Sequence, residues 1–139
     1  MRILKAIKVP AKLEHLHTCV NLVSSCAQHM GFDKKSIHRI ELATEEVLVN
    51  IFTYAYQGDA GDVEISCMLD HGDTFRIEIL DSGVPFNILN VREPNISSDI
   101  DNANIGGLGV FMIKTCMDDV VYRRESGKNI LTLIAYRNT

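Results

Sequence analysis

Hydrophobic and polar positions follow two different periods in the first part of the chain. Residues 2–9 alternate imperfectly and end at Pro10, which predicts a short strand at the edge of a sheet. Over residues 11–30 apolar side chains recur every three to four positions, which predicts a helix. A second, longer helix is expected over residues 33–56, because Asp33 is a suitable N-cap and the helical period resumes behind it.

The second half of the chain returns twice to a strand pattern. Two apolar runs, 63–69 and 74–80, flank a short turn, and two more, 120–124 and 130–136, end the chain. Between these pairs helical periodicity resumes at Val110, behind a glycine-rich segment. The resulting order, β-α-α-β-β-loop-α-β-β, predicts an α+β fold of two layers, with a mixed or antiparallel sheet and the helices on one face.

Between residues 81 and 107 the period disappears. This stretch is rich in Gly, Pro, Asn, Ser and Asp, and so long a segment without regular structure is unusual inside a compact domain. Long loops of this kind serve more often as lids or binding loops than as spacers. We therefore expect a lid or binding loop here.

Composition narrows the class of protein. The chain has 139 residues, 46% hydrophobic and 23% charged, so we expect one globular domain over residues 1–139. Its 14 basic and 18 acidic residues give a net charge of -4 with no Lys/Arg run, which argues against direct binding of nucleic acid. The apolar runs are shorter than the roughly 18 residues of a membrane helix, and no signal peptide is recognisable. These features predict a cytoplasmic protein without membrane contact.

Cysteines and histidines show no arrangement for chemistry. Cys19 and Cys26 lie seven positions apart on a predicted helix, which separates their Cα atoms by about 10 Å, too far for a disulfide. No metal-site or catalytic-triad spacing is found at the five histidines, at Cys67 or at Cys116. We expect free thiols, and histidines that are solvated or satisfied within the fold.

The predicted second helix carries the first candidate chemistry. Glu46 and Asn50 are four positions apart, so their side chains leave the helix on the same face. Glu45 points about 100° away and therefore forms no carboxylate pair with Glu46. Alternatively, this polar face, which also holds Arg39 and Thr53, is only the solvated side of an amphipathic helix. The core-facing side is expected to consist of Ile37, Ile40, Thr44, Val47, Leu48, Ile51 and Ala55.

A second candidate is the segment Asp81-Ser82-Gly83-Val84-Pro85-Phe86, which follows directly on a predicted strand. An aspartate in this place accepts hydrogen bonds from an amine or amide edge, and Gly83 permits a close approach or a positive φ. The alternative is a simple polar turn, since Asp and Gly are common turn residues.

The third candidate is Gly106-Gly107-Leu108-Gly109-Val110, at the start of the last predicted helix. Free backbone N–H groups and the positive end of the helix dipole favour phosphate oxygens at such a place. The segment is neither a G-x-G-x-x-G fingerprint nor a Walker A loop, because the spacing differs and no Gly-Lys-Ser/Thr follows. By itself this motif is a weak signal.

The order and context of the three motifs resemble the GHKL, or Bergerat-fold, ATPases, which include gyrase-type proteins and histidine kinases. Residues 46–50 correspond to the N-box, 81–86 to the G1 box and 106–111 to the G2 box. Within this superfamily the short chain is most similar to the bacterial anti-sigma-factor serine/threonine kinases. The resemblance covers nearly the whole chain, including residues 117–123 and 131–133.

The resemblance implies a role for each motif. Asn50 would hold Mg²⁺ at the nucleotide phosphates, and Glu46 would be the general base toward a serine hydroxyl or water. Asp81 would accept the exocyclic amino group of adenine in ATP, with Gly83 letting the backbone approach the base. Residues 87–105 would form the ATP lid. The phosphates would be cradled by Gly106, Gly107, Leu108, Gly109 and Val110.

The chain departs from its relatives at several positions. Where several relatives carry an arginine in or just before the phosphate loop, this chain has Ile105 and Leu108, and Arg92 is the only basic residue of the lid segment. Tyr54 stands where many relatives have a histidine, and residues 128–130 are Lys-Asn-Ile in place of Gly-Thr-Thr. These departures affect phosphoryl transfer more than ATP binding.

The function that the resemblance implies is an ATP- and Mg²⁺-dependent protein-serine kinase in a partner-switching pathway. Such a protein binds a sigma factor as an anti-sigma factor, phosphorylates a STAS-type antagonist and forms a homodimer. Two alternatives stay open. One is a nucleotide-sensing regulatory module without phosphotransfer, which the missing loop arginine favours. The other is a detached histidine-kinase ATPase domain that acts on a histidine-bearing partner.

Overall fold

Five strands form one antiparallel sheet in the computed structural model, which describes residues 2–90 and 107–137, with only the backbone for residues 107 and 108. The strands are β1 (Arg2–Pro10), β2 (Asp62–Asp70), β3 (Thr74–Asp81), β4 (Asp119–Glu125) and β5 (Lys128–Tyr136). Their order across the sheet is β1-β2-β3-β5-β4, and every neighbouring pair is antiparallel. The strand that ends in a proline therefore lies at an edge, as its sequence predicts.

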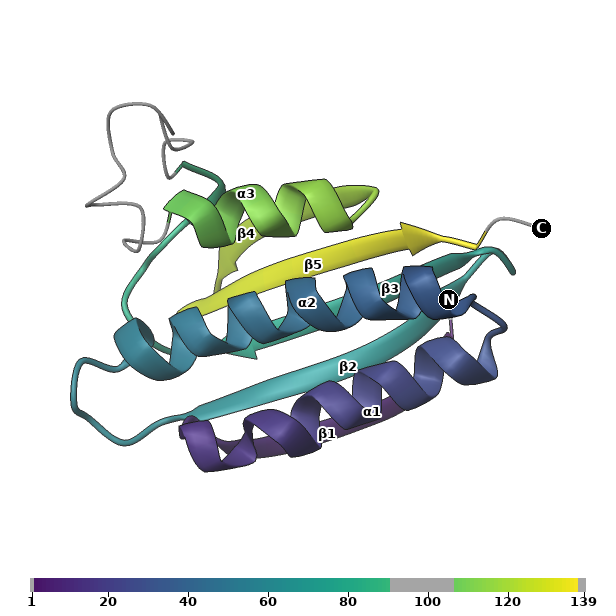
Figure 1. Cartoon of the computed structure of the whole chain (residues 1–139). Helices are drawn as coiled ribbons and strands as arrows, with labels where there is room; N and C mark the ends of the chain where they lie inside the picture. Colours follow the sequence, from purple (N-terminus) through teal and green to yellow (C-terminus); the bar gives the residue numbers. More distant parts are fainter. Residues whose placement is uncertain (1, 91–106, 138–139) are drawn as a thin grey trace.

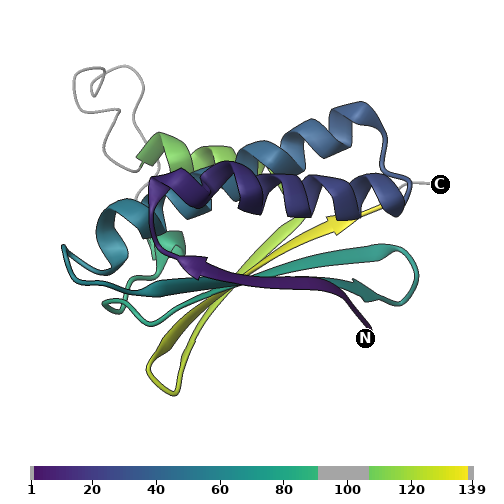
Figure 2. The same cartoon turned by 90° about the horizontal axis from the view of Figure 1, so that it is seen from below.

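Three α-helices lie together on one face of this sheet (Figures 1 and 2). They are α1 (Leu16–His29), α2 (Lys34–Asn50) and α3 (Gly107–Cys116). Three shorter elements adjoin them: η1 (Leu13–His15) before α1, η2 (Ile51–Ala55) after α2 and η3 (Ile88–Asn90) after β3. This arrangement confirms the predicted α+β fold with two layers and helices on one face.

The hydrophobic core fills the space between the helices and the sheet. The predicted core-facing stripe of α2 is correct in its centre and less buried at its ends, where Ile37 and Ile51 are half-buried. The Thr44 hydroxyl donates to the Ile40 carbonyl at 2.8 Å, so this buried polar group has a partner. The buried residues of α2 and its extension are Ile40, Ala43, Thr44, Val47, Leu48 and Ala55.

The second helix differs from its prediction in the last turn. Regular α-helix ends at Asn50, and the chain continues to Ala55 as a π-helical turn, not as α-helix to residue 56. The Ala55 carbonyl accepts a hydrogen bond from the Val84 N–H at 2.9 Å, so it serves the loop after β3. The sequence period does not reveal this change, because a π-helical turn differs from α-helix by only one residue in the hydrogen-bond spacing.

Helix boundaries follow local signals. The Asp33 side chain caps α2 by accepting a hydrogen bond from the Ser36 N–H at 2.8 Å, and this bond holds the pKa of Asp33 below its usual range. Gly31 ends the α1 segment with φ +91°, a conformation that glycine adopts without steric cost. Within the described residues, none of the helices combines the length and the apolar character that a bilayer crossing requires.

All four cysteines are free thiols, as predicted. Burial raises the pKa of Cys19, Cys67 and Cys116, because a thiolate loses its hydration in apolar surroundings. These side chains therefore pack as small apolar groups.

Candidate functional site

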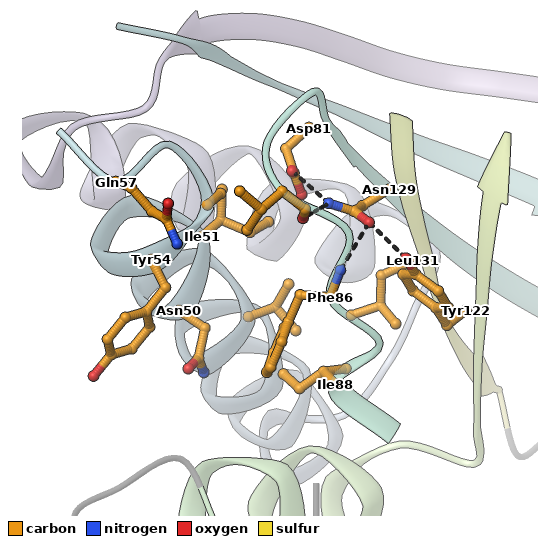
Figure 3. Close-up of a pocket in the computed structure, with 13 residues that line it drawn as sticks. Asn50, Ile51, Tyr54, Gln57, Asp81, Phe86, Ile88, Tyr122, Asn129 and Leu131 are labelled. Carbon is orange, nitrogen blue, oxygen red and sulfur yellow. Dashed lines mark hydrogen bonds between the residues drawn. The ribbon is translucent and has the colours of Figure 1, made fainter. Parts of the chain in front are cut away.

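A cavity of about 380 Å³ lies between the end of α2, η2, the loop after β3 and the β4–β5 hairpin (Figure 3). This volume is in the range of small-molecule sites, and the walls are mainly apolar. The polar groups are few and come from separate elements, among them Asn50, Asp81, Tyr122 and Asn129. The apolar walls consist of Val47, Ile51, Ala55, Val84, Phe86, Ile88 and Leu131.

Asp81 is the buried acceptor of this cavity. It is the last residue of β3 and is only 6% exposed. Its Oδ1 accepts hydrogen bonds from the Gly83 N–H at 2.9 Å and from Asn129 Nδ2 at 2.9 Å. The Oδ2 atom has no hydrogen-bond partner within the part of the chain that the structure describes. Asp81 therefore makes the hydrogen bond of a polar turn to Gly83, as the alternative interpretation expects, and it is also a buried acceptor with one oxygen unpaired within the described residues.

The loop after Asp81 is held from several sides. A Cβ on Gly83 would lie 2.2 Å from the Ala55 carbonyl oxygen, so only glycine allows this approach to η2. Arg124 Nη1 donates to the Gly83 carbonyl at 2.9 Å, and the Tyr56 hydroxyl accepts from the Ser82 N–H at 2.8 Å. The close approach at Gly83 is thus to the protein's own backbone, and its approach to a ligand stays a prediction.

Tyr56 joins this loop to the start of β2. Its hydroxyl also donates to the Asp62 carbonyl at 2.5 Å, and a Cβ on Gly61 would collide with its ring. Burial raises the pKa of Tyr56 above its ordinary value, so the hydroxyl stays protonated and keeps its donor role.

Glu46 and Asn50 lie on the side of α2 that faces α3. Both are half-buried, whereas Glu45 is exposed. A Cβ on Gly109 would lie 2.8 Å from Glu46 Oε2 and 3.6 Å from Asn50 Nδ2, so these side chains occupy the space that a glycine leaves open. The interpretation of this pair as a purely solvated face is therefore wrong, although Arg39 and Thr53 on the same side are exposed.

The glycine-rich motif forms the first turn of α3. The helix begins with Gly107, Leu108, Gly109 and Val110. The N–H groups of this first turn have no acceptor within the helix. The side chain of Val110 is buried in the core, so only its backbone is available to a ligand. Gly106, Ile105 and Arg92 lie outside the described residues, as does the lid segment beyond residue 90.

Asn50 has the chemistry of a magnesium ligand. Its Nδ2 donates to the Glu46 carbonyl at 2.8 Å, which fixes the amide and leaves Oδ1 as the free atom. Magnesium prefers oxygen ligands and is usually held by one or two protein oxygens together with substrate phosphates, so the residue fits this ion. In the described parts of the chain, no three His, Cys, Asp or Glu side chains form a metal-binding group.

Sequence reasoning missed three residues of the site. In the sequence Asn129 stands out only as a departure from related sequences, yet in the structure it is buried and bonded to Asp81. A polar residue beside the apolar run Ile-Leu-Thr-Leu-Ile at the start of β5 is a signal for such a role. Tyr56 and Arg124 have no comparable signal, because each acts on a backbone group distant in sequence.

Comparisons with known proteins show the family to which the chain is related. Residues 9–135 match the family model of the histidine kinase-like ATPase domain. A serine-protein kinase RsbW of Bacillus cereus (strain Q1) is 31% identical over 129 residues, which cover 90% of this chain and 80% of the relative. A serine-protein kinase RsbW of Bacillus anthracis is 30% identical with the same coverage.

Solved structures share the fold at low sequence identity. The RsbU and RsbW domains of Rv1364c from Mycobacterium tuberculosis superpose with a TM-score of 0.66 at 15% identity, over 97% of this chain and 33% of that chain. The SiaB-SiaC complex from Pseudomonas aeruginosa gives 0.63 at 13%, over 97% and 91%. The histidine kinase domain from Erythrobacter litoralis EL346 gives 0.56 at 17%, over 88% and 59%.

The resemblance inferred from three short motifs is therefore confirmed at the level of the family. The family model spans most of the chain, the curated relatives share about a third of its residues, and the fold is that of histidine kinase ATPase domains. The chain belongs to the histidine kinase-like ATPase domain family and, within it, to the anti-sigma serine-protein kinases represented by RsbW.

Proposed function

We propose that the chain binds ATP in this cavity and transfers the γ-phosphoryl group to a serine of a partner protein. The observation that carries the proposal is that two of the three motifs, distant in sequence, line one cavity of small-molecule size, and that the third motif lies against Glu46 of the first. Asn50 and Asp81 line it, and Glu46 lies next to the first turn of α3. Together they offer an acceptor for a base, oxygen and N–H groups for phosphates, and a carboxylate for proton transfer.

The base lies in the apolar part of the cavity. Ile51, Ile88 and Leu131 supply apolar contact for a purine ring, and the unpaired Oδ2 of Asp81 accepts a hydrogen bond from the exocyclic amino group of adenine. The carbonyl oxygen of another base in the same place would face the carboxylate, and neither group could donate a hydrogen bond to the other. This asymmetry favours adenine over bases that present only a carbonyl oxygen.

The phosphates lie at the first turn of α3. Its free N–H groups and the helix dipole favour negative charge there, and Asn50 Oδ1 is the protein oxygen for Mg²⁺. A Mg²⁺ ion held there by Asn50 would offset the negative charge of the phosphates. Gly106 and the lid segment complete this end of the site in the proposal.

Glu46 acts as the general base. Its carboxylate lies beside Gly109 and one helical turn from Asn50, at the end of the site where the phosphates are proposed. It accepts the proton of the serine hydroxyl while that oxygen attacks phosphorus and ADP leaves. A positioned base of this kind contributes about 10²–10⁴-fold to the rate.

The proposed partners are a sigma factor, which the chain binds as an anti-sigma factor, and a small STAS-type antagonist, which it phosphorylates. Membership of the RsbW family supports this pathway, and the SiaB-SiaC complex is an example of a related fold assembled with another protein. The homodimer, the cytoplasmic location and the single domain over residues 1–139 stay predictions of the same proposal.

Nucleotide binding is tested by titration calorimetry with ATP and Mg²⁺. Asp81→Asn replaces the acceptor oxygen by an amide, so we expect ATP affinity to fall about tenfold or more, the loss of one hydrogen bond to a charged group. Asp59→Asn, an exposed position, is the matched control and keeps wild-type affinity. Equal affinity of wild type and the Asp81 variant would contradict the proposed base site.

Phosphoryl transfer is tested with radiolabelled ATP and a candidate antagonist encoded next to this chain. Glu46→Gln lowers transfer by about 100-fold or more, because the amide accepts no proton, while ATP affinity stays within a few fold. Glu45→Gln is the matched control, since this neighbouring carboxylate is exposed and points elsewhere. Transfer at the wild-type rate by the Glu46 variant excludes it as the base.

One observation favours a second candidate, a nucleotide-sensing module without phosphotransfer. Within the described residues, no arginine or lysine lines the cavity. Positive side chains often stabilise the transferring phosphoryl group, and their absence slows transfer more than binding. Tight, Mg²⁺-dependent ATP binding without label transfer to any partner would select this alternative.

A further inference from the structure

We propose that Asn129 sets how strongly the cavity recognises the amino group of a nucleobase, because it holds the Asp81 carboxylate in one orientation. The inference rests on the proposed ATP site and adds a residue to it. Asn129 is a positioning residue, since its effect on the base passes through Asp81.

The Asn129 amide uses its whole hydrogen-bonding capacity within the protein (Figure 3). Nδ2 donates to Asp81 Oδ1 at 2.9 Å and to the Val84 carbonyl at 2.8 Å. Oδ1 accepts from the Tyr122 hydroxyl at 2.5 Å and from the Phe86 N–H at 3.3 Å. Two donors and two acceptor sites are all occupied.

These partners allow only one orientation of the amide. If its nitrogen and oxygen were exchanged, the NH₂ group would face the Phe86 N–H, which is a donor that cannot reorient. The exchanged oxygen would face the Val84 carbonyl and the Asp81 carboxylate, which are both acceptors. Asn129 is 6% exposed, so each mismatch would leave a largely buried polar group without a partner.

Sheet register explains why Asn129 reaches Asp81. The two residues are direct partners in the β3–β5 pair, and directly opposed residues in antiparallel strands project to the same face. Their side chains therefore meet at the edge of the cavity without a loop between them. A contact between two paired strands is less mobile than one carried by a loop.

The consequence for Asp81 is a fixed carboxylate. Oδ1 is held by two donors, the Gly83 N–H and Asn129 Nδ2, so a rotation of the carboxylate breaks at least one of these bonds. The free Oδ2 is thereby kept in one direction. Without Asn129 only one bond holds Oδ1, the carboxylate gains rotational freedom, and an amino group in the cavity gains less from its hydrogen bond.

The test measures the contribution of the amino group in each variant. ATP and purine riboside triphosphate, which lacks only the 6-amino group, are titrated against wild type and Asn129→Leu. We expect wild type to bind ATP about tenfold more tightly than the analogue, or more. In the leucine variant we expect this affinity ratio to be smaller by a factor of about three or more. If the leucine variant does not fold, Asn129→Ser takes its place in the same measurement.

Leu131→Ala is the matched control, because it changes an apolar wall of the cavity without touching Asp81. It weakens both nucleotides in parallel and keeps their ratio. If the Asn129 variant also weakens both equally, Asn129 is merely structural and the inference is overturned. A wild-type chain that binds no ATP refutes the proposed function instead, so the two failures are distinguishable.

Discussion

The carboxylate of Glu46 in α2 lies against Gly109 in α3, where a Cβ would stand 2.8 Å from Oε2. Two residues 63 positions apart in the sequence thus meet in one contact, where the phosphates are proposed to lie. Close packing of α3 on α2 at this point depends on the missing side chain. The same contact places the proposed base beside the first turn of the helix.

Gly109→Ala is predicted to slow phosphoryl transfer without lowering the stability of the fold. The new methyl group displaces the end of the flexible Glu46 side chain, so the fold accommodates it, and alanine favours helix over glycine by up to about 1 kcal/mol. We expect an unchanged or higher thermal midpoint, with phosphoryl transfer at least about tenfold slower because the base is misplaced. Lys114→Ala, exposed on the same helix, is the control. Unchanged transfer in the Gly109 variant would contradict the proposed position of the base.

Gly83→Ala is predicted to lower stability as well as ATP binding. Its Cβ would lie 2.2 Å from the Ala55 carbonyl oxygen, and this backbone atom moves only if η2 moves. Overpacking of this kind costs about 1–3 kcal/mol, so we expect a lower midpoint of thermal unfolding together with weaker ATP binding. Ser82→Ala keeps the backbone bond to Tyr56 and is expected to resemble wild type. A stable Gly83 variant would show that the loop has room to shift.

Two neighbouring arginines offer a matched pair of variants. Arg124 donates to the Gly83 carbonyl at 2.9 Å, whereas Arg123 pairs with exposed Glu125 at 3.1 Å. Arg124→Met releases one support of the loop after Asp81, so we expect ATP affinity to fall by about three- to tenfold. Arg123→Met removes only a surface ion pair and leaves affinity unchanged. Equal affinities in the two variants would exclude Arg124 as a support of the site.

The N-cap of α2 predicts a pH dependence of stability. The hydrogen bond from the Ser36 N–H lowers the pKa of Asp33 in the folded state below its unfolded value. Its stabilisation is therefore complete above the unfolded pKa, near 4, and is lost as the pH falls through the lower folded pKa. Asn also caps helices but does not titrate in this range, so the midpoint difference between wild type and Asp33→Asn should decrease from pH 6 to pH 3. A constant difference over this interval would contradict the contribution of the carboxylate.

Local features of the sequence predicted the elements well, because their causes are local. Asp33 caps α2 through a residue three positions away, and the turn between β2 and β3 has His71 and Gly72 at positive φ, as hairpin composition favours. The π-helical turn after Asn50 and the support by Tyr56 were not predictable in this way. The Tyr56 hydroxyl accepts from the Ser82 N–H, which only the folded chain brings near, and the π-helical turn leaves no mark in the hydrophobic period.

The sequence by itself determined the order of the elements, the edge position of β1 and, through three short motifs, the family to which the chain belongs. Period, caps and turn residues are enough for this, because they act within a few positions. Only the tertiary structure decided that Glu46 lies against Gly109 and that Asn129 holds Asp81. Sheet register and helix packing set these contacts, and both arise from burial of the whole core, which no single segment encodes.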